Sequence, residues 1–305
     1  MPKIAYQGYP NNYSSLALKE LSKKYKFDAE SQSFATYEEL FKSSSDFAFF
    51  AIQNNSYSLN DLFSKISEYK WNVVAEYYWS TPLDLVGSGS FKDVKYIVAV
   101  DHILSICKKF FANSKYQVIS VDDTAEACRF VSEKNSFEYA AIAPKFTANQ
   151  FSLKSIKEKI EDDSALTRFY LVSKDSSSSS VSKLFSSSNS SKNSSSVSSS
   201  SYSENPFKSS LMIKLTNQSG SLHRAIGCFS TRNINISQIE SFSSSRSKSA
   251  FSPWDHYFLL DVEGDYKDSN VSNAIENLKE FANEVVVLGS YPSLVQERAV
   301  SPVGN

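Results

Sequence analysis

The chain has 305 residues, of which 41% are hydrophobic and 14% aromatic, so it is long enough for two domains with cores of their own. Its formal net charge of −1 lacks the basic excess that is typical of nucleic-acid-binding proteins, and we expect no nucleic-acid partner. It holds no long apolar run and starts directly in a strand-like segment, which predicts a cytoplasmic protein without a membrane span. Cys107, Cys128 and Cys228 show no CxxC spacing, so we expect reduced thiols and no metal site.

Residues 1–175 alternate between short apolar strands and amphipathic helices. Such alternation favours an α/β fold with mainly parallel sheets and helices on both faces, divided into two lobes with a cleft between them. The expected strands are 3–6, 27–31, 47–52, 71–79, 81–86, 96–100, 117–121, 139–143 and one starting at 167. The expected helices are 13–25, 36–42 (with a capping box), 60–70, 102–111 and 124–133.

Two turns in this region are suited to bind a ligand. A strand and a Gly-containing turn precede the helix 13–25, which Asn12 or Ser14 could cap, and free backbone N–H groups at such a helix start attract anions. The buried run 47–52 stops at the amides Gln53, Asn54 and Asn55. The carboxyl end of a buried strand is where open α/β sheets bind ligands, although a turn that only caps the strand is an equal alternative.

A third candidate is Thr167-Arg168-Phe169, which leads from the acidic loop 160–163 into an apolar strand. A hydroxyl and a guanidinium at a strand entrance are well placed to face a cleft. Taken alone, the same residues are more typical of an Arg that is salt-bridged at a strand end.

The remainder of the chain divides into a linker and a second domain. Residues 176–208 are rich in Ser and have little to bury, which predicts a flexible linker. Residues 209–295 show the order βαββαβ of a ferredoxin-like unit, followed by a tail over 296–305. The turn Gly220-Ser221-Leu222 at its first helix is again suited to an anionic ligand.

The order of short motifs resembles that of prephenate dehydratase with a C-terminal ACT regulatory domain. The motifs that carry this resemblance are Thr167-Arg168-Phe169, the strand 140–143, the first strand and turn 5–14, Gly220 to Ala225, 234–241, Pro253-Trp254 and Leu288 to Pro292. The resemblance implies a periplasmic-binding-protein-like catalytic domain over 1–175 and an ACT domain over 209–295.

The resemblance also implies an activity, which is the decarboxylating dehydration of prephenate to phenylpyruvate in phenylalanine biosynthesis, without a cofactor or metal. Thr167 takes the family's catalytic position, as a donor to the leaving hydroxyl. The implied substrate-binding residues are Asn12, Tyr13, Ser14, Gln53, Asn54, Asn55, Arg168 and Phe169. Phenylalanine would act as effector on a homodimer or homotetramer, at Gly220, Ser221, Leu222, Glu240 and Ser241.

Several family positions differ in this chain, and they leave alternatives open. The family's Glu-Asn-Ser motif reads Gln53-Asn54-Asn55, its Ser-His pair reads Ala99-Val100, and the Asn two places before the catalytic Thr is Ala165. The alternatives are therefore an arogenate dehydratase or a paralogue that binds these ligands without turnover. A solute-binding protein of similar shape is disfavoured by the ACT-like region.

Overall fold

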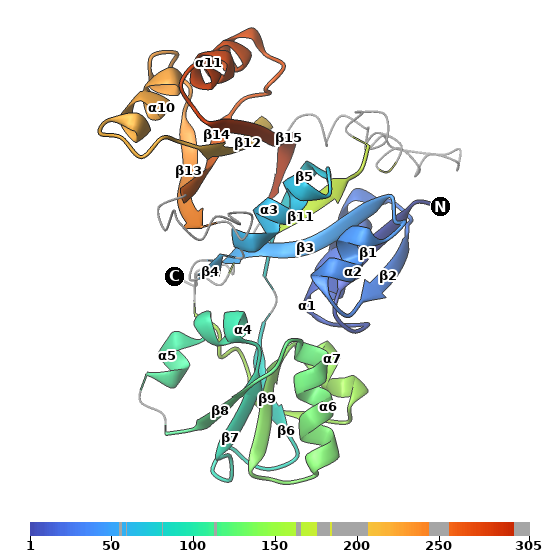
Figure 1. Cartoon of the computed structure of the whole chain (residues 1–305). Helices are drawn as coiled ribbons and strands as arrows, with labels where there is room; N and C mark the ends of the chain where they lie inside the picture. Colours follow the sequence, from blue (N-terminus) through green and yellow to red (C-terminus); the bar gives the residue numbers. More distant parts are fainter. Residues whose placement is uncertain are drawn as a thin grey trace, which may run out of the picture. The chain divides into compact units, whose positions relative to one another are not determined.

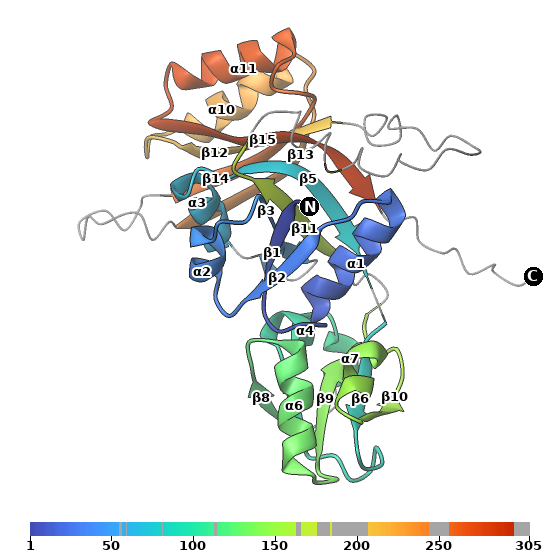
Figure 2. The ribbon, with the colours of Figure 1, turned by 90° about the vertical axis from the view of Figure 1, so that its right-hand side faces the viewer.

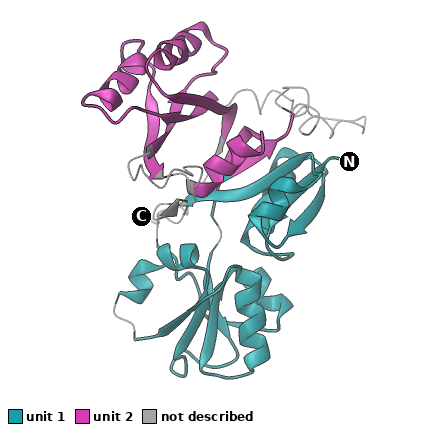
Figure 3. Ribbon diagram, in the orientation of Figure 1, with its two compact units in different colours: residues 1–58, 79–169 teal, residues 59–78, 170–305 magenta. Residues whose placement is uncertain are grey.

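The computed structural model describes residues 1–54, 57–58, 60–80, 82–112, 115–162, 166–175, 184, 207–243 and 256–295. They form two compact units (Figure 3), one made of Met1–Ser58 and Trp79–Phe169 and the other of Leu59–Tyr78 and Tyr170–Asn305. The chain therefore passes between the units three times, between Ser58 and Leu59, inside β5 (Asn72–Trp79) and inside β11 (Thr167–Ser173).

The first lobe of unit 1 is built on a parallel sheet. Its elements are β1 (Lys3–Gln7), α1 (Tyr13–Tyr25), β2 (Glu30–Phe34), α2 (Tyr37–Lys42), β3 (Phe47–Asn54) and β4 (Tyr57–Ser58). β1 lies between β2 and β3 and is parallel to both, whereas β4 is antiparallel to β3. The apolar run of β3 is buried, as a strand covered on both faces requires. The predicted capping box of α2 is present, formed by Thr36 and Glu39.

The second lobe of unit 1 holds a mixed sheet with strand order β10-β6-β9-β7-β8 (Figure 1). Its elements are β6 (Asp84–Gly87), β7 (Tyr96–Ala99), α4 (Asp101–Ser105), α5 (Lys108–Phe111), β8 (Gln117–Ser120), α6 (Thr124–Lys134), β9 (Tyr139–Ala143), α7 (Lys145–Gln150) and β10 (Lys154–Lys157). β7 is parallel to β8 and β9, and β6 is antiparallel to β9 and β10. Ala127, Cys128 and Val131 of α6 pack in one core with this sheet. The predicted α/β class with parallel sheets is confirmed.

The predicted helix over 102–111 is wrong, because the chain forms two short helices there, α4 and α5. Residue Asp162, far along the chain, interrupts the helical bonding at this point. Its backbone N–H donates to Ile106 O over 2.8 Å, and its Oδ1 accepts from the N–H of Lys109 over 3.1 Å. A side chain that takes a backbone N–H in this way starts a new helix. The sequence analysis also missed α7 and β10, which are short and lack a clear apolar period.

Unit 2 contains an antiparallel sheet with strand order β13-β14-β12-β15. Its elements are α3 (Asn60–Glu68), β5 up to Tyr78, β11 from Tyr170, β12 (Phe207–Lys214), α10 (Ser221–Ser230), β13 (Ile236–Ser243), β14 (His256–Glu263), α11 (Ser269–Lys279) and β15 (Glu284–Val295). α10 and α11 lie side by side on one face of the sheet (Figure 2) and share a core with it. This is the predicted βαββαβ arrangement.

Strand β15 extends to Val295 and pairs in parallel with β5, with Ser293 opposite Glu76. At Gly289 of β15, a β-carbon would lie 2.1 Å from Val73 O, so only glycine fits there.

Lys208 of β12 forms an ion pair with Glu76 of β5. Its Nζ lies 2.8 Å from Glu76 Oε1, and Glu76 is fully buried. β12 begins at Phe207, inside the segment predicted as linker. Residues 176–206, except Leu184, and the tail 296–305 lie outside the described residues.

None of the helices in the described part of the chain is long and apolar enough to cross a membrane.

Candidate active site

Thr167 is the first residue of β11, and its side chain is 1% exposed. Its Oγ1 forms no hydrogen bond with any described residue. A buried hydroxyl without a partner is uncommon in proteins, because water has been removed from it and nothing replaces that water. The hydroxyl is therefore available as a donor to a ligand at the place where the sequence predicts the catalytic residue.

Phe169, two residues further on, is fixed by a cluster of aromatic rings within unit 1. Its ring stacks on Phe49 of β3 with centroids 5.0 Å apart and an interplanar angle of 1°. Tyr13 and Trp79 also contact it, at 6.0 and 6.4 Å between centroids. Phe169 is fully buried and Tyr13 is 4% exposed. Aromatic pairs of this kind contribute beyond their buried area, so the cluster holds the start of β11 against the first lobe.

Asn12 caps α1, as predicted, and its amide is fully engaged. Its Oδ1 accepts from Ser15 N over 2.9 Å. Its Nδ2 donates to Gln7 O over 2.8 Å and to Asp123 Oδ2 over 2.7 Å. Both N–H hydrogens are thus used inside the protein. While these bonds hold, Asn12 shapes the turn before α1 and has no hydrogen left for a substrate.

Asp123 is a buried residue that the sequence analysis did not single out, and it joins the two lobes of unit 1. Its Oδ1 caps α6 by accepting from the N–H groups of Ala125 and Glu126. Its Oδ2 accepts from Asn12 Nδ2 and from Tyr9 N. Burial raises the pKa of Asp123, while the hydrogen bond from Asn12 and those from the backbone act against that shift. The only signal in the sequence was an Asp immediately before a predicted helix.

The same turn is also held by α7. Thr147 Oγ1 donates to Asn11 O over 2.9 Å, and Asn11 Nδ2 donates to Gln150 Oε1 over 2.9 Å. Asn11 itself has a φ of 68°, a left-handed conformation that Asn adopts more readily than most residues. The turn from Gly8 to Asn12 is therefore clamped between the lobes at several points.

The other predicted substrate residues that the structure describes lie on α1, β3 and β11. Ser14 lies buried in the first turn of α1, and Arg168 is 2% exposed on β11. Gln53 is half-buried near the end of β3. For Asn54 the backbone alone is described, paired with Tyr57 of β4, and Asn55 lies outside the described residues.

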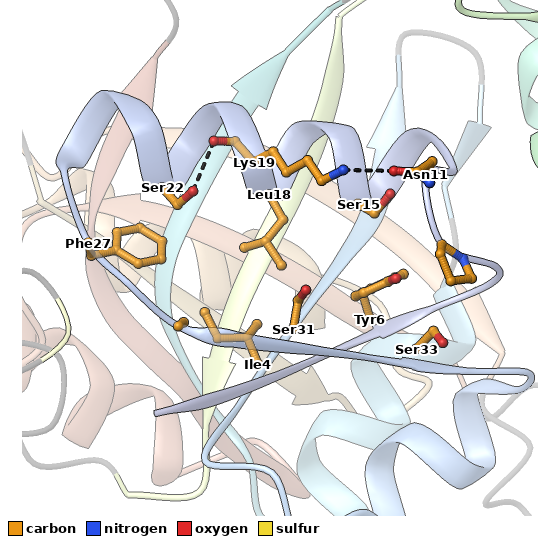
Figure 4. A pocket seen from close by; sticks show the side chains of 12 residues that line it. Ile4, Tyr6, Asn11, Ser15, Leu18, Lys19, Ser22, Phe27, Ser31 and Ser33 are labelled. Atoms are coloured by element: carbon orange, nitrogen blue, oxygen red, sulfur yellow. Dashed lines mark hydrogen bonds between the residues drawn. The ribbon is translucent and has the colours of Figure 1, made fainter. Parts of the chain in front are cut away.

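A pocket of about 330 Å³ opens between α1 and the strands β1 and β2 (Figure 4), and Thr167 is not among the residues that line it. Ile4, Leu18 and Phe27 give it apolar walls, and several hydroxyls and Lys19 line the rest. Three of these polar groups have partners inside the protein. Ser22 Oγ donates to Lys19 O, Ser15 Oγ donates to Asn12 O, and Lys19 Nζ donates to Asn11 Oδ1. We therefore do not place the chemistry in this pocket.

The predicted effector residues lie in unit 2 on two elements of the βαββαβ region. Gly220 is the N-cap of α10 with φ 80°, and a β-carbon there would meet open space. Ser221 is buried, with its Oγ 3.2 Å from Thr216 Oγ1, whereas Leu222 is 36% exposed. Glu240 and Ser241 belong to β13.

A family model described as prephenate dehydratase matches residues 4–177, which is more than half of the chain. The chain belongs to this family. The arogenate dehydratase/prephenate dehydratase 1 of Arabidopsis thaliana is 26% identical over 308 residues, covering 95% of this chain and 72% of the relative. The prephenate dehydratase of Bacillus subtilis is 29% identical over 212 residues, covering 67% of this chain and 66% of that enzyme.

The fold of this chain is similar to that of the Arthrobacter aurescens prephenate dehydratase, whose structure was solved in complex with L-Phe. The TM-score is 0.71 at 20% identity, with 96% of this chain and 93% of the other covered. The chain is thus a lyase-type dehydratase of the prephenate and arogenate dehydratase group. In the described part of this dehydratase, no group of three or more His, Cys, Asp or Glu could hold a metal ion.

The dehydratase should lose stability in mild acid through His102 of α4. Burial lowers the pKa of His102 from 6.5 to about 4, although Asp101 acts in the opposite direction. Between these values the unfolded chain binds a proton that the folded chain does not, so stability falls as the pH falls through this window. We expect at most about 2 kcal/mol of the loss between pH 7 and pH 5 to come from this group.

Urea unfolding at pH 7, 6 and 5 tests this expectation. The unfolding free energy of His102→Gln should fall less between pH 7 and pH 5 than that of the wild type. The same change at the exposed His223 should leave the wild-type fall unaltered. Equal declines in the wild type and in His102→Gln would contradict it.

Proposed function

We propose that this dehydratase converts prephenate to phenylpyruvate. In this reaction the bond from the ring carbon to its carboxylate breaks, and the bonding electrons move into the ring as carbon dioxide leaves. The ring C–O bond breaks at the opposite position, and the departing hydroxyl takes up a proton and leaves as water. Aromatisation drives the reaction, so the protein has to orient the substrate and assist a poor leaving group.

The observation that carries this proposal is the buried hydroxyl of Thr167, which has no hydrogen-bond partner among the described residues. A threonine is a weak acid, so its role is that of an oriented hydrogen-bond donor to the departing oxygen, with the proton supplied through water. Removing one oriented donor of this kind typically costs about 10²–10³-fold in kcat. The buried site adds to the effect, because a hydrogen bond is stronger where water is excluded.

The two substrate carboxylates need positive partners. Arg168 follows the proposed donor directly, and its guanidinium is suited to bind a carboxylate through two parallel hydrogen bonds or to brace the loop before β11. Replacement of the family's acid by Gln53 reduces the negative charge near a dianionic substrate. The amide of Asn55 and the start of α1 remain the other predicted contacts.

Steady-state assays with prephenate and with arogenate test the choice of substrate. We expect the higher kcat/KM with prephenate, whose side chain carries a keto group where arogenate carries an amine. A higher value with arogenate would assign the amino-acid substrate instead. Calorimetric binding of prephenate without product from either compound would identify a binding protein that has lost turnover.

We also propose that phenylalanine regulates the enzyme through an ACT domain formed by the βαββαβ region. The open surroundings of Gly220 and the exposed Leu222 support a ligand site at the start of α10. The effector would shift an equilibrium between states of the catalytic unit in a homodimer or homotetramer. Unchanged turnover and unchanged sedimentation in millimolar phenylalanine would refute this part. The cytoplasmic location stays a prediction.

A further inference from the structure

Unit 2 contains a cluster of buried polar groups for which the proposed chemistry gives no role. Its members are Tyr170 of β11, Ser210 of β12, Asp261 of β14 and Tyr291 of β15. Tyr170, Ser210 and Tyr291 are fully buried, and Asp261 is 1% exposed. Polar groups at this depth destabilise a fold unless they are bonded to one another.

The hydrogen bonds in this cluster form a connected set with a defined direction. Ser210 Oγ donates its one proton to Asp261 Oδ1 over 2.5 Å. Tyr291 Oη donates to Tyr170 Oη over 3.2 Å. Ser210 accepts in its 3.2 Å contact with Tyr170 Oη, because its own proton is used, and it makes a further short contact with Tyr291 Oη. The phenol groups thus converge on one serine, and that serine is oriented by a buried carboxyl group.

Aromatic packing keeps the tyrosine rings in place. The rings of Tyr170 and Tyr291 meet edge to face with centroids 5.7 Å apart. Phe63 of α3 contacts Tyr170 at 6.3 Å and Phe242 of β13 at 5.8 Å. The hydroxyl of Tyr170 has little freedom to turn away from Ser210, so the cluster is rigid.

Tyr170 connects this cluster to the candidate active site, because it lies on the same strand as Thr167. Tyr170 is the third residue after Thr167, about 10 Å along an extended strand. Phe169, between them, packs within unit 1, whereas Tyr170 packs within unit 2. Successive strand residues point to opposite faces, so Tyr170 points away from the face that carries the Thr167 side chain. It can act on the donor only through the backbone of β11.

We propose that Tyr170 is a positioning residue for the dehydratase reaction, because its hydroxyl fastens the strand that carries Thr167 to β12 and β15 of the βαββαβ region. The strand is then held at two successive residues after the donor, by the aromatic cluster at Phe169 and by the hydroxyl cluster at Tyr170. This inference rests on the proposed function for its effect on turnover, but not for the fastening itself.

The test compares Tyr170→Phe with Tyr257→Phe in the full-length protein. Both changes remove one hydroxyl and keep the ring, and Tyr257 Oη donates to Glu284 Oε2 within the βαββαβ region, outside the cluster. Amide hydrogen exchange of β11 and steady-state kinetics with prephenate are measured for each. Tyr170→Phe should raise exchange in β11 about 3- to 10-fold, the equivalent of one lost buried hydrogen bond. It should lower kcat about 10-fold and change KM less than 2-fold, because a displaced donor affects the chemical step.

Tyr291→Phe should have the same effects, and the double variant should be less impaired than two independent changes predict, since both hydroxyls serve one cluster. Unchanged β11 exchange in Tyr170→Phe would overturn the fastening. Faster exchange with kcat equal to that of Tyr257→Phe would overturn the role in positioning the donor. If the wild type shows no turnover while β11 exchange responds as expected, the proposed function has failed and the fastening stands.

Discussion

Thr167→Val should reduce kcat about 10²–10³-fold without destabilising the protein. Valine has nearly the shape of threonine but cannot donate to the departing oxygen. The Thr167 hydroxyl is buried and has no partner among the described residues, so its removal also removes an unsatisfied polar group. A group of this kind typically costs about 1–3 kcal/mol of folding stability, so the variant should unfold at the same or a higher urea concentration. Loss of activity with a gain in stability indicates a hydroxyl that serves a ligand.

Thr147→Val is the matched control for this change. Thr147 is also fully buried in unit 1, but its Oγ1 donates to Asn11 O over 2.9 Å. Valine at this position leaves a carbonyl without its donor, so stability should fall by about 1–3 kcal/mol. If Thr167→Val were destabilised like Thr147→Val while keeping its activity, Thr167 would be a structural residue.

Gly8→Ala should be the most damaging small substitution in the turn before α1. Gly8 has φ 101°, and a β-carbon there would lie 2.1 Å from Asp123 Oδ2 and 2.2 Å from Asn12 Nδ2. The backbone conformation alone disfavours alanine by roughly 1–2 kcal/mol. The methyl group would also force apart the bond between Asn12 and Asp123, which adds about 1–3 kcal/mol for a buried charged acceptor. We expect a loss of about 2–5 kcal/mol in unfolding free energy, together with reduced turnover.

Gly264→Ala separates the two contributions to this loss. Gly264 has a similar φ of 114°, but a β-carbon there would meet only the Val271 Cγ2 methyl group, at 2.9 Å, and would break no hydrogen bond. Its loss of stability should therefore come from the backbone conformation and this one apolar contact. Chemical unfolding measures the loss of unfolding free energy in both variants. Equal losses would show that the hydrogen bond between Asn12 and Asp123 contributes little to stability.

Elements that depend only on residues close together in the sequence could be predicted from local patterns. The buried run of β3, the cap at Asn12 and the box at Thr36 and Glu39 depend on neighbouring residues, and the structure has them where they were expected. β2 was placed too early because its side chains are largely exposed and show no apolar pattern. The break between α4 and α5 depends on Asp162, more than fifty residues away, which no local pattern reveals.

In the candidate site, too, features that depend on neighbouring residues could be predicted, whereas contacts between distant residues could not. Thr167 could be proposed from the sequence because its motif is contiguous. The aromatic cluster at Phe169 could not be foreseen, because its rings come from separate elements. The role of Asn12 was predicted only in part. Its cap is a local feature, but its bond to Asp123 joins residues 111 positions apart. The Tyr170 cluster is likewise drawn from four strands.

The most direct test of the central claim is the reaction of the purified full-length protein with prephenate, with phenylpyruvate and carbon dioxide measured together. We predict that the wild type releases both products in equal amounts and that Thr167→Val forms them at least about 100-fold more slowly. The account would be contradicted if the wild type formed no phenylpyruvate, or if the valine variant formed it at the wild-type rate.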